Sequence, residues 1–164
     1  MTAAEPGAGA ATSSIVVGVD GSPGSRQALA WAIGEARRRK AVVRAVLVWS
    51  DPYAAVGPSS LFGLGDEGKA RLRRQLAATV RLARADEGSR GDGGEPAPRV
   101  VQKVTGGEPV EVLCAESRGA DLLVVGTRGL GGLKHLLLGS VSERCAQLSP
   151  TPVVIVPPPA DGAG

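Results

Sequence analysis

Five short apolar runs alternate along the chain with longer segments in which apolar residues recur every three or four positions. Continuous runs of β-branched residues that end at polar or glycine residues are typical of buried strands in a parallel sheet. The third run mixes apolar and polar residues, so we expect it nearer to an edge of the sheet. The predicted strands occupy residues 15–19, 42–48, 99–105, 121–125 and 153–156.

The intervening segments predict four helices, at residues 23–40, 67–85, 109–118 and 140–148. Ser22 and Pro23 supply a capping hydroxyl and a first-turn proline for the first helix, a combination that is frequent at helix starts. Ser140 and Glu143 match the capping box that opens many helices. We interpret the basic residues 37–40 and the arginines of the second helix as solvated surface.

Strands that alternate with helices specify one open parallel sheet with helices on both faces. We expect a single α/β domain over residues 15–157, between flexible tails at residues 1–14 and 158–164, with loops at residues 52–65 and 86–98. Sheets of this kind bind ligands beyond the carboxyl ends of their strands, at the point where the strand order reverses.

Two strand ends carry chemistry that suits a nucleotide phosphate. Asp20 and Gly21 follow the first strand, and Gly126 begins a glycine-bearing loop after the fourth. That loop leads to Gly139 and Ser140 at a helix start, where main-chain N–H groups and the helix dipole favour an anion. If the first and fourth strands are neighbours, both segments line one crevice.

Composition limits which core residues, partners and cellular locations can be expected. Aromatic residues make up only 2% of the chain, so the core must consist of alanine, valine and leucine, and stacking platforms for nucleic-acid bases are scarce. The net charge of +3 is mildly basic, and we do not expect a nucleic-acid partner.

The pattern shows neither a signal peptide nor an apolar run of membrane-span length, so we expect a cytoplasmic protein without membrane contact. Cys114 and Cys145 lie on apolar helix stripes without metal-ligand spacing, and we interpret them as small buried hydrophobic residues.

The glycine spacing resembles the ATP-binding signature of the universal stress protein family, G-x2-G-x9-G-[S/T]. The signature positions are matched by Gly126, Gly129, Gly139 and Ser140. The resemblance covers residues 15–157 and includes the segments 19–22 and 151–156.

The resemblance implies a Rossmann-like sheet of strand order 3-2-1-4-5 with two helices on each face. It also implies an ATP site between the first and fourth strands, with Asp20 near the ribose and phosphates and with Val19 and Val48 beside the adenine. Glycines would admit the ribose and phosphates, and N–H and hydroxyl groups at the helix start would hold the phosphates. These positions are Gly126, Gly129, Gly139, Ser140, Val141 and Ser142.

Further expectations concern the ligand and the assembly. Mg would accompany ATP without a metal site made of protein ligands alone, and AMP or cyclic AMP are alternative ligands. The resemblance implies a homodimer in which the last strands pair across a two-fold axis, through Val153, Val154, Ile155 and Val156.

Several site residues have a structural alternative. Ser140 can cap the helix, Asp20 can close a turn with the glycine that follows it, and Gly126 and Gly129 can serve turns alone. Cationic side chains in the loop are candidate phosphate contacts, although such side chains also occur as solvated surface. They are Arg128, Lys134 and His135.

The leading hypothesis is an ATP-binding regulatory protein of the stress response that does not turn its nucleotide over rapidly. The alternatives are a slow ATPase or an adenylate- or phosphoryl-transferring enzyme that uses the same crevice, and a dimeric interaction module that binds no nucleotide. The chain carries no G-x4-G-K-[S/T] motif and no G-x-G-x-x-G opening after the first strand, which disfavours a P-loop enzyme and a conventional dinucleotide dehydrogenase.

Overall fold

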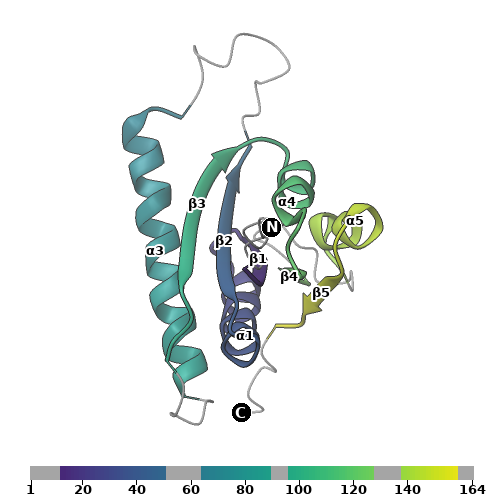
Figure 1. Cartoon of the computed structure of the whole chain (residues 1–164). Helices are drawn as coiled ribbons and strands as arrows, with labels where there is room; N and C mark the ends of the chain where they lie inside the picture. The colour runs from purple at the N-terminus through teal and green to yellow at the C-terminus, as the bar shows by residue number, and fades with distance from the viewer. Residues whose placement is uncertain (1–11, 51–63, 90–95, 128–137, 159–164) are drawn as a thin grey trace, which may run out of the picture.

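A five-stranded parallel sheet with helices on both faces forms the body of the molecule (Figure 1). The computed structural model describes residues 12–50, 64–89, 96–127 and 138–158. The strands lie in the order β3-β2-β1-β4-β5, which confirms the predicted fold and places β3 at an edge. Their bounds are β1 Ser14–Val19, β2 Val42–Trp49, β3 Val100–Gly106, β4 Leu122–Gly126 and β5 Val153–Val156.

Among the described residues, two helices cover each face of the sheet, as the resemblance implied. Helices α1, Pro23–Arg39, and α3, Asp66–Gly88, pack together on one face. Helices α4, Pro109–Ser117, and α5, Ser140–Leu148, cover the other. In Figure 1 α4 and α5 lie beside each other, on the opposite side of the sheet from α1.

The central strand β1 is buried on both faces, because its side chains alternate between the two helix layers. Ile15 and Val17 contribute to the core beneath α1 and α3, whereas Val16 contributes to the core beneath α4 and α5. All three are fully buried, and full burial of one such side chain contributes about 1.5–3 kcal/mol. A core of small aliphatic residues agrees with the composition.

Helix α3 continues three residues past its predicted end, so the expectation of a loop from residue 86 was wrong. Asp86 and Glu87 remain helical and pair with arginines of α1. Arg26 Nε lies 3.1 Å from Asp86 Oδ2, and Arg37 pairs with Glu87 in a half-buried position. The interpretation of residues 37–40 as solvated surface is therefore wrong for Arg37.

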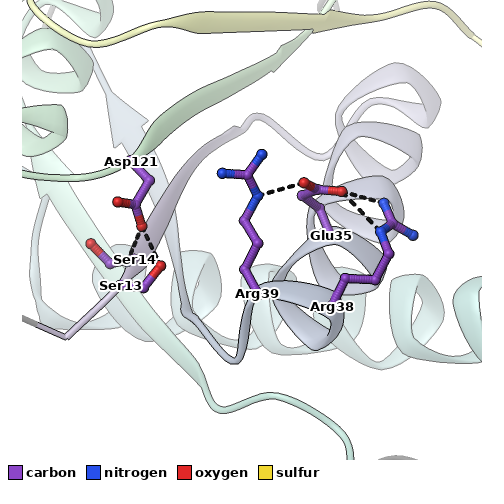
Figure 2. Close-up of polar contacts among 6 residues, drawn as sticks. All are labelled: Ser13, Ser14, Glu35, Arg38, Arg39 and Asp121. Carbon is purple, nitrogen blue, oxygen red and sulfur yellow. Dashed lines mark hydrogen bonds and ion pairs between the residues drawn. The ribbon is translucent and has the colours of Figure 1, made fainter.

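The amino-terminal ends of the central strands are tied together by polar contacts (Figure 2). Asp121 Oδ2, just before β4, accepts hydrogen bonds from the Ser13 hydroxyl and from the Ser14 N–H. Close by, the Glu35 carboxylate of α1 accepts hydrogen bonds from Arg39 and Arg38, which lower its pKa. The Asp121 contacts join the start of β1 to the start of β4, whereas the Glu35 contacts lie within α1.

At the opposite end of the sheet, α1 begins directly against the end of β4. A Cβ atom on Gly126 would lie 2.9 Å from the carbonyl carbon and oxygen of Gly24 and 3.2 Å from the N of Ser25. All three are main-chain atoms, which cannot yield as a flexible side chain can. Glycine at position 126 is therefore required by helix packing, whatever ligand is present.

Gly126→Ala is expected to lower the free energy of unfolding by about 1–3 kcal/mol, because the added methyl group would overpack this junction. Gly34→Ala in α1 is the matched control. Its Cβ would meet only the Glu87 side chain, at 3.6 Å, and alanine favours the helix by up to about 1 kcal/mol over glycine. Urea denaturation measures both variants, and a Gly126→Ala protein as stable as the wild type would contradict the packing account.

Candidate functional site

The order of the strands reverses between β1 and β4. From β1 the chain moves through β2 to β3 on one side, and then returns to place β4 on the other side of β1. The carboxyl ends of β1 and β4 lead into Asp20 and Thr127, so the two segments singled out in the sequence do lie at neighbouring strand ends. This is the position at which open parallel sheets bind ligands.

The segment after β1 forms a closed turn that leads into α1. Asp20 Oδ1 accepts the N–H of Ser22 at 2.9 Å, and Gly21 between them has φ of 84°. Ser22 Oγ accepts the N–H of Ser25 at 3.1 Å and so caps α1. The turn role that the sequence left open for Asp20 is thus present in the structure, and it fixes the half-buried carboxylate at the end of β1.

Thr127 holds the start of α5 against the end of β4, although the sequence did not single it out. Its carbonyl oxygen accepts the Gly139 N–H at 2.6 Å and the Ser142 hydroxyl at 3.0 Å, and its own N–H donates to Val156 O at 3.0 Å. The main chain makes these contacts, so residue type gave no signal for them. Thr127 Oγ1 is buried and has no hydrogen-bond partner within the described ranges.

Helix α5 spans Ser140–Leu148, the predicted bounds, but its cap is not the predicted one. Gly139 occupies the N-cap position, Ser140 is the first helical residue and is exposed, and the first backbone bond runs from Glu143 N to Gly139 O at 3.0 Å. The predicted box with Ser140 as cap is therefore wrong. The Ser142 hydroxyl instead bonds back to Gly139 O at 2.8 Å and to Thr127 O.

The first turn of α5 consequently presents main-chain donors without a side-chain cap. The N–H groups of Ser140, Val141 and Ser142 precede the first intrahelical hydrogen bond, and glycine has no side chain to accept from them. The caps of α1 and α4 differ in this respect. Ser22 Oγ caps α1, and the Glu108 carboxylate accepts the N–H at the start of α4 at 2.9 Å.

The two valines assigned to the adenine lie on opposite faces of the sheet. Val19 is 3% exposed and belongs to the core beneath α1 and α3. Val48 is half-buried against the core beneath α4 and α5. The side chains cannot both line one pocket, and Val19 can offer a ligand only its main chain.

Part of the predicted site lies outside the described residues. This applies to the second glycine of the signature and to the three cationic loop residues, which are Gly129, Arg128, Lys134 and His135. Where the structure describes the chain, no three His, Cys, Asp or Glu side chains are grouped as a metal site requires. In the same residues no helix combines the length and the apolar character needed to cross a bilayer.

Known proteins resemble the chain over most of its length. The model of the Universal stress protein family matches residues 12–157. A universal stress protein of Mycolicibacterium smegmatis is 38% identical over 144 residues, which are 88% of this chain and 45% of that protein. The chain thus spans less than half of that relative. The universal stress protein YxiE of Bacillus subtilis is 32% identical over 154 residues, covering 87% of this chain and 97% of the relative.

Solved structures share the fold. A universal stress protein in complex with cAMP has a TM-score of 0.63 and 28% identity, covering 88% of this chain and 96% of that one. A universal stress protein from Archaeoglobus fulgidus in complex with dAMP has a TM-score of 0.58 over 88% of this chain and 97% of that one, and at 21% identity it supports the fold alone. With its sheet order, its glycine signature and the family match over residues 12–157, the chain belongs to the universal stress protein family.

Proposed function

We propose that this chain binds an adenine nucleotide, with ATP as the expected ligand, beyond the carboxyl ends of β1 and β4. In this proposal the bound nucleotide controls a regulatory or partner-binding role in the stress response. The observation that carries the proposal is the start of α5, where uncapped N–H groups are held beside the end of β4. A related structure in complex with cAMP supports an adenine nucleotide as the ligand class.

The phosphates are assigned to the first turn of α5. A helix N-terminus carries about half a positive charge, and the N–H groups of Ser140, Val141 and Ser142 can each donate to a phosphate oxygen. The exposed Ser140 hydroxyl adds a further donor. The Ser142 hydroxyl is turned to the carbonyls of Gly139 and Thr127, so Ser142 contributes its N–H group.

The rest of the nucleotide is assigned to neighbouring strand ends. Asp20 is proposed to face the ribose, and the half-buried Val48 side chain and the Val19 main chain to border the adenine. Gly126 keeps α1 close to this edge. The loop after β4 is proposed to supply the remaining contacts to the ribose and phosphates. A Mg ion is proposed to accompany the phosphates. The loop residues are Gly129, Arg128, Lys134 and His135.

The proposal extends to a homodimer through β5. This strand has β4 on one side only and forms an edge of the sheet. Its residues Val153, Val154 and Ile155 are only half-buried in the single chain, and Leu148 just before it is 59% exposed. An apolar edge strand of this kind favours pairing with a second copy.

Sedimentation equilibrium is expected to give twice the mass of one chain at micromolar concentration, because pairing of two β5 strands would extend the sheet across a two-fold axis. A Leu148→Lys variant places a charge beside the proposed interface while leaving the core unchanged. It is expected to shift the equilibrium toward single chains. A single-chain mass for the wild type over the whole concentration range would contradict the dimer.

Ser140→Pro is expected to weaken ATP binding roughly tenfold or more, because it removes one N–H donor to a charged group. Proline is well tolerated at a first helical position; α1 and α4 already begin with Pro23 and Pro109, and Gly139 is extended with φ of −79° and ψ of 162°. Ser140→Ala is the matched control, since it removes the hydroxyl and keeps the N–H. Calorimetry measures both dissociation constants, and equal ATP affinity of the two variants would contradict the role of this N–H.

A thermal shift series with ATP, AMP and cyclic AMP, with and without Mg, separates the three hypotheses. A ligand at about 100 times its dissociation constant stabilises the folded state by about 2.7 kcal/mol, which amounts to several degrees for this chain length. Equal melting temperatures with every nucleotide would favour the nucleotide-free module. Rapid Mg-dependent release of phosphate by the pure protein would favour the enzyme.

A further inference from the structure

The outer side of α3 carries a cluster of positive charge. Between residues 68 and 85 the helix contains six cationic residues and no acidic one, because its four carboxylates lie in the first and last turns. All six cationic residues are exposed. In Figure 1 α3 runs along the outside of the molecule beside β3. We call these six residues the basic face: Lys69, Arg71, Arg73, Arg74, Arg81 and Arg84.

Helical periodicity gathers most of these charges on one side of α3. Arg74 and Arg81 are seven residues apart, and Arg73 and Arg84 are eleven apart, so each pair returns to nearly the same side of the helix after two or three turns. At a rise of about 1.5 Å per residue, the four arginines span about 16 Å along the helix axis. Ala77 lies between the two rows, and its small side chain leaves the guanidinium groups accessible.

The basic face is not neutralised by the protein itself. Among the described residues, none of its six side chains forms an ion pair with a carboxylate. Arg84 donates to the main-chain carbonyl of Pro98 at 3.2 Å, and this neutral acceptor leaves the charge of the guanidinium uncompensated. On α1, by contrast, the Glu35 carboxylate pairs with both Arg38 and Arg39.

The net charge of +3, which by itself does not suggest a nucleic-acid partner, conceals this distribution. The chain contains 19 lysines and arginines and 16 aspartates and glutamates. Without the six cations of the basic face, 13 cations stand against 16 acidic residues, and the rest of the chain carries a net charge of −3. The excess of positive charge is therefore concentrated on one helix, where it attracts a polyanion.

We propose that the basic face binds the phosphate backbone of double-stranded DNA without reading the base sequence. Five of its six cations are arginines, whose planar guanidinium groups bind phosphate oxygens in a bidentate manner. At about 3.4 Å per base pair, the four arginines of the two rows can follow about five base pairs of a duplex. The basic face lies on the opposite side of the sheet from α5, so this binding does not depend on the proposed nucleotide.

The side chains of α3 favour a duplex over other polyanionic partners. Binding of single strands relies on aromatic side chains that stack on the bases, and the basic face has none. A membrane-bound helix buries its apolar side in lipid, whereas the apolar side of α3 is buried in the core through Leu76, Val80 and Ala83. Leu82 is the one large apolar side chain exposed on the described part of α3, too little for the apolar centre of a typical protein interface.

Fluorescence anisotropy of a labelled DNA duplex, titrated with the wild-type protein in the absence of nucleotide, tests the proposal. At about 50 mM salt, a duplex of about 20 base pairs is expected to bind with a dissociation constant in the micromolar range, and a duplex of unrelated sequence equally well. The logarithm of the association constant should fall with the logarithm of the salt concentration with a slope of about −4, as expected for four to five neutralised phosphates.

Charge-removing variants locate the binding surface. Arg74→Gln combined with Arg81→Gln is expected to weaken binding about tenfold and to reduce the salt slope by about two, because two phosphate contacts are lost. Arg38→Gln combined with Arg39→Gln is the matched control, since it removes two exposed arginines from α1 and lowers the net charge equally. The control should leave the affinity and the slope nearly unchanged. Glutamine is a good helix former, so both variants should melt near the wild-type temperature.

The proposal is overturned if the wild type does not bind the duplex at about 50 mM salt. It is also overturned if the two double variants weaken binding equally, because the net charge and not the basic face would then account for the attraction. Tighter binding to single-stranded DNA of the same length, or to vesicles of anionic lipid, would contradict the assignment of the duplex as partner.

Discussion

The carbonyl oxygen of Thr127 accepts hydrogen bonds from the Gly139 N–H and the Ser142 hydroxyl, and the position of α5 depends on these two contacts. They join the end of β4 to the start of α5 across the intervening loop. The Ser142 hydroxyl donates its proton there, and Gly139 at the cap position has no side-chain oxygen to offer the first N–H groups of the helix. The contacts that fix α5 therefore leave its first turn without a side-chain cap beside the end of β4.

The two faces of the sheet are held in different ways. Ion pairs from Arg26 and Arg37 join α1 to the end of α3. Helices α4 and α5 instead share a cluster of apolar side chains, with an ion pair from Arg144 to Glu108 at the start of α4. Glu116 of α4 is paired with Lys103 of β3 and Arg44 of β2, and so links α4 to both strands. The hydrogen bonds from Lys103 and Arg44 lower the pKa of the Glu116 carboxyl.

Much of the fold was predictable from local pattern. Runs rich in valine predicted the positions of the strands. Pro23 and Pro109 predicted two helix starts, and the structure confirms both. The cap of α5 was not predictable in this way, because Ser140 and Gly139 both suit an N-cap and the choice rests on the distant carbonyl of Thr127. Likewise, the end of α3 depends on arginines of another helix, which no local pattern contains.

The site residues show the same division between local and distant causes. The strand ends and the Asp20 turn follow from neighbouring residues. Glycine is needed at position 126 because the backbone of Gly24 approaches it closely, and this approach exists only once α1 packs on β4. Side-chain alternation along the strands separates Val19 from Val48, which a family signature by itself does not reveal. A signature thus indicates a candidate site, while packing decides which atoms of each residue are available.

Amide proton NMR during an ATP titration tests the central claim most directly. The account predicts that the amide signals of Ser140, Val141 and Ser142 shift and that their hydrogen exchange slows, because phosphate oxygens would accept from these N–H groups. The capped first turn of α4 should keep its signals. Saturable ATP binding that leaves the three α5 amides unchanged would contradict the account.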